Sequence, residues 1–141
     1  MEQEQTTSVI RAFLWGKNSN GQLGVGDAIS NNEKVTVPTQ IDVGTISLTQ
    51  IECGGWHTVA LSRNGEVFTW GNNSHGELGH GDEKDRNKPT KVERLSGENI
   101  VKVACRYSHT VTLTATGKEL TWYVLCDTIS SFPLPPHFNT H

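Results

Sequence analysis

Short apolar runs, which alternate with polar, glycine-containing turns, occupy most of this chain and predict β-strands. The runs are rich in β-branched and aromatic residues, which favour strands, and no segment keeps a helical period over about 10–12 residues. Asn64-Gly65, a strong hairpin signal, joins two of the runs. The predicted strands are residues 11–15, 35–43, 46–53, 56–61, 66–70, 88–95, 99–105, 109–113 and 118–122. These features predict an all-β fold.

Two of the predicted strands contain a proline, Pro38 in one and Pro89 in the other. A proline donates no backbone hydrogen bond to a neighbouring strand, so it is tolerated mainly at the edge of a sheet. We therefore expect both strands to be edge strands.

A glycine-rich segment that begins at a tryptophan occurs twice. Residues 15–27 and residues 70–82 are identical at nine of thirteen positions, with an offset of 55. Such self-similarity indicates a repeat architecture. Four short strands per repeat, joined by glycine turns, with a period in the low fifties, are typical of β-propeller blades.

The glycines of these segments are expected to permit positive φ and close packing between strands. We expect Leu23 and Leu78 to be buried between blades, and Asp27 and Asp82 to cap turns by accepting backbone N–H groups. Residues 76–81 also contain Gly-x-x-Gly-x-Gly, but the Lys-Ser/Thr of a phosphate-binding loop is absent and no helix follows. Packing is therefore predicted rather than ligand binding.

Part of the repeat occurs once more. Residues 99–105 match residues 47–53 at an offset of 52, and residues 109–113 match residues 57–61. After Trp122 the pattern ends, because the remaining chain contains no glycine and is apolar and proline-rich. We therefore predict three segments: a disordered lead (1–9), the repeats (10–122) and a non-repeat tail (123–141).

The positions shared by the repeats are predicted to be structural. They are Trp15, Gly16, Gly21, Leu23, Gly24, Gly26, His57, Gly65, Trp70, Gly71, Gly76, Leu78, Gly79, Gly81, His109, Gly117 and Trp122.

Composition limits the classes of partner and compartment. A net charge of -3 gives no general attraction to nucleic acid or to an anionic membrane surface. No apolar run approaches the ~20 residues that span a bilayer. The polar, acidic start does not resemble a secretory signal. We expect an intracellular protein, cytoplasmic or nuclear and not secreted.

The three cysteines, Cys53, Cys105 and Cys126, are an odd number at wide spacing. This indicates reduced thiols. Cys53 and Cys105 occupy equivalent repeat positions, and we expect both to be small buried residues.

Four histidines are candidates for chemistry. His57 and His109 share a repeat position, which favours an architectural role with each imidazole held by backbone groups between blades. His75 and His80 occupy variable positions and are expected at the surface. No histidine or cysteine pair has the spacing of a zinc motif. No catalytic constellation, metal or cofactor is expected.

A run of mixed charge follows the second glycine-rich segment. It mixes acidic and basic side chains, which is typical of a solvated loop, and it is a candidate interaction loop. It consists of Asp82, Glu83, Lys84, Asp85 and Arg86.

Together, these motifs resemble the repeats of the regulator of chromosome condensation family. Its pattern joins an apolar strand, Cys-Gly, His-(Thr/Ser)-x-x-Leu and Trp-Gly-x-Asn-x-x-Gly-Gln-Leu-Gly-x-Gly. The pattern runs through residues 51–82 almost without a gap, with a trailing piece at 15–27 and a leading piece at 101–122. The resemblance covers about residues 11–122 and implies a seven-bladed β-propeller of four-stranded antiparallel blades.

A complete ring conflicts with the length of 141 residues, because seven blades of about 50 residues need roughly 350. We expect an incomplete β-propeller, with about two full four-stranded antiparallel blades plus a partial one. Three alternatives are open: a truncated product or fragment of a longer propeller protein, which we favour, several copies that assemble into one ring, and a chain that persists alone with exposed edges.

The resemblance implies protein–protein binding through loops on one propeller face and no enzymatic activity. The expected partner is a protein, such as a small GTPase or a ubiquitin-pathway or kinase complex. One alternative is guanine-nucleotide exchange on a small Ran-like GTPase, although no wedge-like insertion is present. Another is a UV-B-receptor-like light sensor: Trp56 resembles part of that receptor's Gly-Trp-Arg-His-Thr motif, but no residue separates it from His57.

Overall fold

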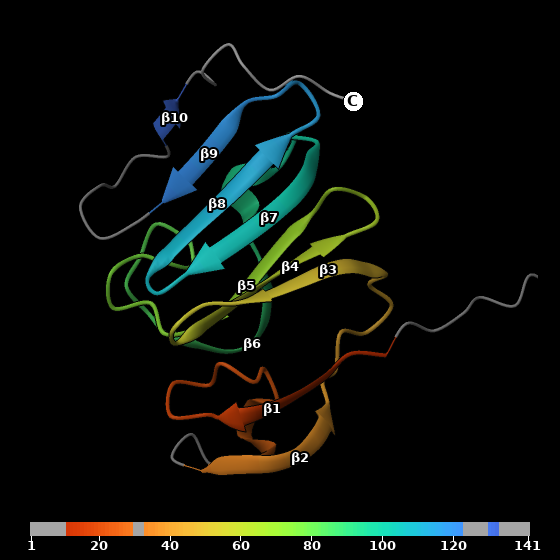
Figure 1. Ribbon diagram of the computed structural model, residues 1–141, viewed down its shortest axis with the longest axis vertical. Helices are drawn as coiled ribbons and strands as arrows, with labels where there is room; N and C mark the ends of the chain where they lie inside the picture. The colour runs from red at the N-terminus through yellow and green to blue at the C-terminus, as the bar shows by residue number, and fades with distance from the viewer. Residues whose placement is uncertain (1–10, 30–32, 123–129, 133–141) are drawn as a thin grey trace, which may run out of the picture.

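Three antiparallel sheets follow one another in chain order along the long axis of the molecule (Figure 1). The structure is a computed structural model that describes residues 11–29, 33–122 and 130–132. The predicted disordered lead and most of the predicted tail lie outside these residues.

The first sheet contains β1 (Phe13–Lys17) and β2 (Lys34–Gln40). The second contains β3 (Leu48–Cys53), β4 (His57–Ser62), β5 (Val67–Gly71) and β6 (Arg86–Lys91). The third contains β7 (Ile100–Arg106), β8 (His109–Thr114), β9 (Glu119–Trp122) and β10 (Ser130–Phe132). The helical elements among the described residues are two 3-10 turns, η1 (Gly26–Ala28) and η2 (Glu93–Leu95).

The second and third sheets are four-stranded meanders in which each strand pairs with its neighbour in sequence. At the tight turn between β4 and β5, the Gly65 N–H donates to the Ser62 carbonyl at 3.1 Å, and Gly65 has a φ of 76°. The all-β prediction and the predicted hairpin are therefore confirmed.

The first sheet has the same pairing as the outer half of the second. In both sheets the register shifts at one tryptophan, where three residues of the partner strand face one residue of the tryptophan strand. The matched pairs are Leu14–Thr39 and Gly16–Val35 in the first sheet, and Thr69–Thr90 and Gly71–Arg86 in the second. The strands β1 and β2 therefore correspond to the third and fourth strands of a blade.

The proline-containing strands β2 and β6 are edge strands, as predicted. The predicted strand at 88–95 is wrong in its second half, because the chain leaves the sheet after Lys91. Val92 and Leu95 then turn into the core, with 1% and 4% of their surface exposed. In the third sheet, the corresponding edge position is occupied by β10, which pairs with β9.

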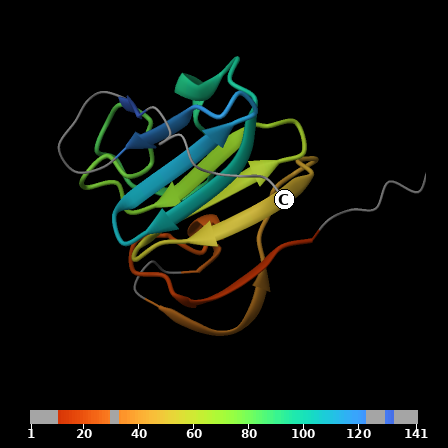
Figure 2. The same ribbon diagram turned by 45° about the horizontal axis from the view of Figure 1, so that its top comes forward.

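The core lies between successive sheets, and Figure 2 shows from a second angle that the third sheet lies over the second. In β5, Phe68 and Trp70 pack with Leu14 of the first sheet, whereas Val67 packs with Leu120 of the third. Alternate residues of one strand therefore point toward the preceding and the following sheet. We call these two sides the upstream face and the downstream face of a sheet.

No helix within the described ranges is long and apolar enough to cross a membrane.

Candidate functional site

Two glycine-rich loops, loop 1 (residues 16–27) and loop 2 (residues 71–82), link the sheets. Each is shaped by a buried asparagine. Asn73 Oδ1 accepts the Leu78 N–H at 2.9 Å, and its Nδ2 donates to the Asp82 carbonyl at 2.8 Å. In loop 1, Asn18 Oδ1 accepts the Leu23 N–H at 3.1 Å. Both leucines are buried, and each loop is thus held by its own side chains.

One backbone carbonyl in each loop accepts two hydrogen bonds from the next sheet. The Gln22 carbonyl accepts the Thr58 hydroxyl at 2.8 Å and the Trp70 Nε1–H at 3.0 Å. We call this contact between a loop and the next sheet a joint. At the second joint, the Glu77 carbonyl accepts the Thr110 hydroxyl at 2.9 Å and the Trp122 Nε1–H at 2.6 Å. The repeat in the sequence is therefore a repeat of one inter-sheet contact.

A glycine lies against the tryptophan ring at each joint. A Cβ on Gly24 would lie 2.6 Å from Trp70 Nε1, and a Cβ on Gly79 would lie 2.7 Å from Trp122 Cε2. Any side chain at these two positions would displace the indole. The sequence-predicted glycines with positive φ are Gly16, Gly21, Gly24, Gly26, Gly65, Gly71, Gly76, Gly79, Gly81 and Gly117.

The three repeat tryptophans differ sharply in burial. Trp70 and Trp122 are 0% and 4% exposed, whereas Trp15 is 60% exposed. The first two are covered by loops 1 and 2 of the preceding sheets. Trp15 lies on the upstream face of the first sheet, and no other sheet among the described residues covers it.

The imidazole of His57 spans the second and third sheets. Its Nε2 lies 2.9 Å from the Thr110 hydroxyl, and backbone groups of Tyr107 and His109 also interact with the ring. Burial lowers the pKa of His57, and this effect outweighs the Glu77 carboxylate and the backbone groups of Tyr107 and His109, which raise it. A neutral histidine therefore links the two sheets at neutral pH.

His109, in the matching position on β8, is exposed, and so is His75. The prediction that His80 lies at the surface is wrong, because its ring is half-buried and its Nε2 lies 3.0 Å from the Thr69 hydroxyl. Burial, followed by the charge of Arg86, lowers the pKa of His80 to about 4. The matching residue in loop 1 is Val25, an apolar residue that already indicated packing at this position.

The expectation that Cys53 is buried is also wrong, because Cys53 is exposed and Cys105 is half-buried. They belong to β3 and β7, which are the first strands of their sheets and leave one strand edge open. Burial raises the pKa of Cys105 to about 12, so this thiol stays protonated.

Several charged side chains of the candidate interaction loop form hydrogen bonds and ion pairs with groups of the loop itself or of loop 2. Arg86 binds Asp82 through two contacts of 3.0 and 2.9 Å, and also donates to the Lys84 carbonyl at 2.6 Å. The Arg86 guanidinium holds the pKa of Asp82 well below its usual range. Asp85 accepts a backbone N–H of loop 2 at 2.8 Å, and Glu83 is exposed.

The two aspartates that were predicted to cap turns behave differently. Asp82 accepts the Lys84 N–H at 3.0 Å within its own turn. Asp27 accepts the side-chain amide of Asn87 at 2.8 Å. Asn87 lies on β6, so the Asp27 contact joins loop 1 to the second sheet.

The turns before β4 and β8 together present two exposed aromatic side chains, Trp56 at 42% and Tyr107 at 67%. The Gly55 N–H donates to the Tyr107 carbonyl at 2.9 Å, and the Asn72 N–H donates to the Trp56 carbonyl at 2.9 Å. The Arg106 guanidinium lies 5.9 Å from the centre of the Tyr107 ring. We call Trp56 and Tyr107 the rim pair.

Trp56 was identified from the sequence, but Tyr107 was missed. Tyr107 stands where the preceding repeat has Gly55, and its φ of 47° is unusual for a non-glycine residue. The replacement of a turn glycine by a tyrosine is the signal that could have revealed it.

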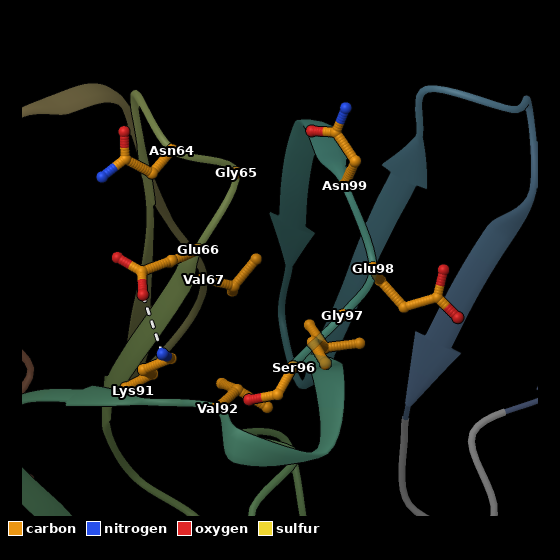
Figure 3. Close-up of a pocket in the computed structure, with 11 residues that line it drawn as sticks. Asn64, Gly65, Glu66, Val67, Lys91, Val92, Ser96, Gly97, Glu98 and Asn99 are labelled. Carbon is orange, nitrogen blue, oxygen red and sulfur yellow. Dashed lines mark hydrogen bonds and ion pairs between the residues drawn. The ribbon is translucent and has the colours of Figure 1, made fainter.

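A hollow of about 290 Å³ lies between the Asn64-Gly65 turn and the segment that follows η2 (Figure 3). The Glu66 carboxylate and the Lys91 ammonium, which line it, pair with each other at 2.7 Å. Within the described ranges, no group of three or more histidines, cysteines or acidic residues could hold a metal ion.

Comparisons with known proteins agree with this geometry. The family model for the Regulator of chromosome condensation (RCC1) repeat matches residues 11–61 and 64–113, and a second model for this repeat matches residues 48–77. Probable E3 ubiquitin-protein ligase HERC3 of Homo sapiens is 41% identical over 111 residues, which are 78% of this chain and 10% of that protein. Ultraviolet-B receptor UVR8 of Arabidopsis thaliana is 37% identical over 109 residues, which are 77% of this chain and 24% of the receptor.

Solved structures give the same architecture. Human WBSCR16 superimposes with a TM-score of 0.70 at 26% identity, over 79% of this chain and 28% of that one. Prp20p of Saccharomyces cerevisiae superimposes with a TM-score of 0.71 at 23% identity, over 80% and 29% of the two chains, which shows the fold alone. The chain thus spans about a tenth to under a third of the length of these proteins. It belongs to the regulator of chromosome condensation (RCC1) repeat family and is a partial array of that family's β-propeller repeats.

Proposed function

We propose that this chain is a protein–protein interaction module and that its blades are part of a longer propeller. The observation that carries the proposal is the rim pair, Trp56 and Tyr107, two exposed aromatic side chains on adjoining turns of neighbouring sheets. Large aromatic residues contribute a disproportionate share of binding energy in protein interfaces.

The surroundings of the rim pair suit a protein partner. Both turns are fixed by backbone hydrogen bonds, so little conformational entropy is lost when they are covered. A shallow hollow beside Trp56 is lined by polar residues, which is the arrangement of an aromatic anchor with a polar rim. Its lining residues are Asn20, Trp56, Asn72, Ser74, His75 and Ser108.

The partner classes that we propose to test are small GTPases and components of ubiquitin-pathway or kinase complexes. One relative is named a probable ubiquitin-protein ligase, and the yeast propeller protein Prp20p is described as binding Gsp1p and histones. We propose an intracellular, non-enzymatic role for this chain, in the cytoplasm or the nucleus.

The test measures binding of the purified chain to panels of GDP-loaded small GTPases, ubiquitin-conjugating enzymes and kinase domains. Trp56→Ala combined with Tyr107→Ala should weaken binding at least about tenfold. Val101→Ala, which truncates an exposed side chain on β7, is the control that should leave binding unchanged. Failure of every panel to bind, or equal binding by the double variant, would refute the proposal.

Two sequence-based alternatives have separate readouts. Nucleotide exchange would accelerate GDP release from a GTPase in the panel. A light sensor of the UV-B type would lose an oligomer on UV-B illumination, and Trp56→Phe would abolish that response. The exposed Trp56 and the 37% identity to the ultraviolet-B receptor favour testing the second alternative.

A further inference from the structure

The first sheet exposes three large apolar side chains. Phe13, Trp15 and Val37 are 46%, 60% and 63% exposed. Phe13 and Trp15 alternate with Leu14, which packs into the core between the first two sheets, so both lie on the upstream face. The same repeat positions are buried in the other sheets: Phe68 at 6%, Trp70 at 0%, Leu120 at 4% and Trp122 at 4%.

In the second and third sheets, the repeat tryptophan is covered by the glycine-rich loop of the preceding sheet. Loop 1 lies over Trp70, with Gly24 against the indole ring and the Gln22 carbonyl accepting the indole N–H. Loop 2 covers Trp122 in the same way, through Gly79 and the Glu77 carbonyl. The structure therefore shows directly what fits on such a face.

The partner strand supplies the rest of the contact. On β6, Lys88 lies over Gly26 of loop 1, and Asn87 donates to Asp27 of loop 1 at 2.8 Å. The shared register places Val37 and Thr36 of β2 at the positions of Lys88 and Asn87. Both β2 residues are exposed.

We propose that the upstream face of the first sheet, formed by Phe13, Trp15, Thr36 and Val37, is a docking site for the glycine-rich loop of another RCC1-type blade. Trp15 Nε1 donates to the carbonyl of the Gln or Glu in Gly-(Gln/Glu)-Leu-Gly-x-Gly. The glycine after the leucine lies against the indole, and the Thr36 hydroxyl faces the terminal aspartate of the loop.

A second copy of this chain fits the face less well. Its two described glycine-rich loops are already docked, on Trp70 and on Trp122, so neither is available. The occupant is therefore a blade of the same family with an undocked loop. This inference rests on the repeat geometry and does not depend on the rim pair.

The isolated loop can serve as the probe because much of its shape is internal. Asn73 ties the start of loop 2 to its end by donating to the Asp82 carbonyl at 2.8 Å, and the Glu77 carboxylate accepts the His75 N–H at 2.8 Å. Head-to-tail cyclisation of a peptide with the sequence of residues 71–82 preserves this closure and lowers the entropy lost on binding.

The experiment titrates this cyclic peptide into the full-length ¹⁵N-labelled chain and follows the four tryptophan indole N–H signals by NMR. The Trp15 signal, assigned with Trp15→Phe, should shift in a saturable manner, while the Trp70 and Trp122 signals stay in place. Trp15→Ala should weaken binding, read from the remaining shifts of β1 and β2 amides, at least about tenfold. Trp56→Ala, on the rim, should leave it unchanged.

Two variant peptides make the test specific. Gly79→Val should abolish binding because a Cβ at this position collides with the ring, as the 2.7 Å separation from Trp122 shows. His75→Ala removes an exposed side chain and should bind like the parent peptide. No saturable Trp15 shift, equal binding of the Gly79→Val peptide, or occupation of the face by a second copy in a Trp15-dependent dimer would overturn the proposal.

Discussion

Gly79 and Trp122 are in direct contact across the joint between the second and third sheets, with no room for a methyl group between them. A Cβ on Gly79 would lie 2.7 Å from Cε2 of the indole. Loop 2 can therefore approach the third sheet closely enough for the Glu77 carbonyl to accept the Trp122 N–H at 2.6 Å. The glycine and the tryptophan of the repeat are two halves of one contact.

Replacing Gly79 by alanine should destabilise the fold strongly. The residue has a φ of 74°, which costs alanine roughly 1–2 kcal/mol, and the collision with Trp122 adds about 1–3 kcal/mol. Urea unfolding followed by circular dichroism measures the loss. Gly76 is a matched control, because it has the same φ of 74° but no atom within 4 Å of its Cβ position. Equal losses for Gly76→Ala and Gly79→Ala would contradict the packing role.

Phenylalanine in place of a repeat tryptophan should reduce stability more at the two joints than on the exposed upstream face of the first sheet. Trp70→Phe and Trp122→Phe each remove a buried indole N–H bond and leave a cavity, which should cost about 1–3 kcal/mol of unfolding free energy. The acceptor carbonyls remain bonded to Thr58 and Thr110, which limits the loss. Trp15→Phe, at a position 60% exposed, should cost less than about 0.5 kcal/mol. A similar loss of unfolding free energy at all three sites, measured with urea, would contradict the finding that Trp15, unlike Trp70 and Trp122, is not covered by another sheet.

The strands and the joints could be predicted from sequence because both depend on local pattern. Alternating apolar residues mark the strands, and the second copy of the glycine-rich segment marks the contact that recurs. The exposure of Trp15 could not be predicted in this way. Its sequence surroundings match those of Trp70, and the difference arises from which sheet lies on top of each.

The errors have related physical causes. Cys53 was expected to be buried because it shares a repeat position with Cys105, but β3 is the first strand of its sheet and leaves one edge open. His80 was expected at the surface because it varies between the two copies, although Val25 at the matching position indicated packing. Burial depends on the position of a strand in its sheet and on neighbouring sheets, which repeat identity alone does not specify.

Glu77→Gln should lower the pKa of His57 further. The Glu77 carboxylate raises this pKa against the dominant effect of burial, so removing its charge removes the opposing effect. Glutamine keeps the acceptor for the His75 N–H, as Gln22 does for the Asn20 N–H in loop 1 at 2.8 Å. An NMR titration of the His57 ring signals measures the change. An unchanged or raised pKa would contradict the electrostatic coupling between loop 2 and His57.

His80→Val should make the stability of the protein less sensitive to acid. The pKa of His80 is about 4 in the folded chain, against 6.5 for a free histidine, so the unfolded chain binds the proton first as the pH falls. Its contribution to the unfolding free energy is complete above pH 6.5 and is lost between pH 6.5 and about 4, by about 1–2 kcal/mol at pH 5.

The pKa of His57 is also lowered, so His57 contributes to the same loss of stability, and that part of the loss persists in the His80→Val variant. The lowered pKa of Asp82 acts only below its ordinary value of 3.8. The unfolding free energy, measured with urea at pH 7 and pH 5, should therefore differ less for His80→Val than for the parent chain. Valine is chosen because Val25 occupies the matching position in loop 1. An equal difference would show that the environment of His80 does not control its protonation.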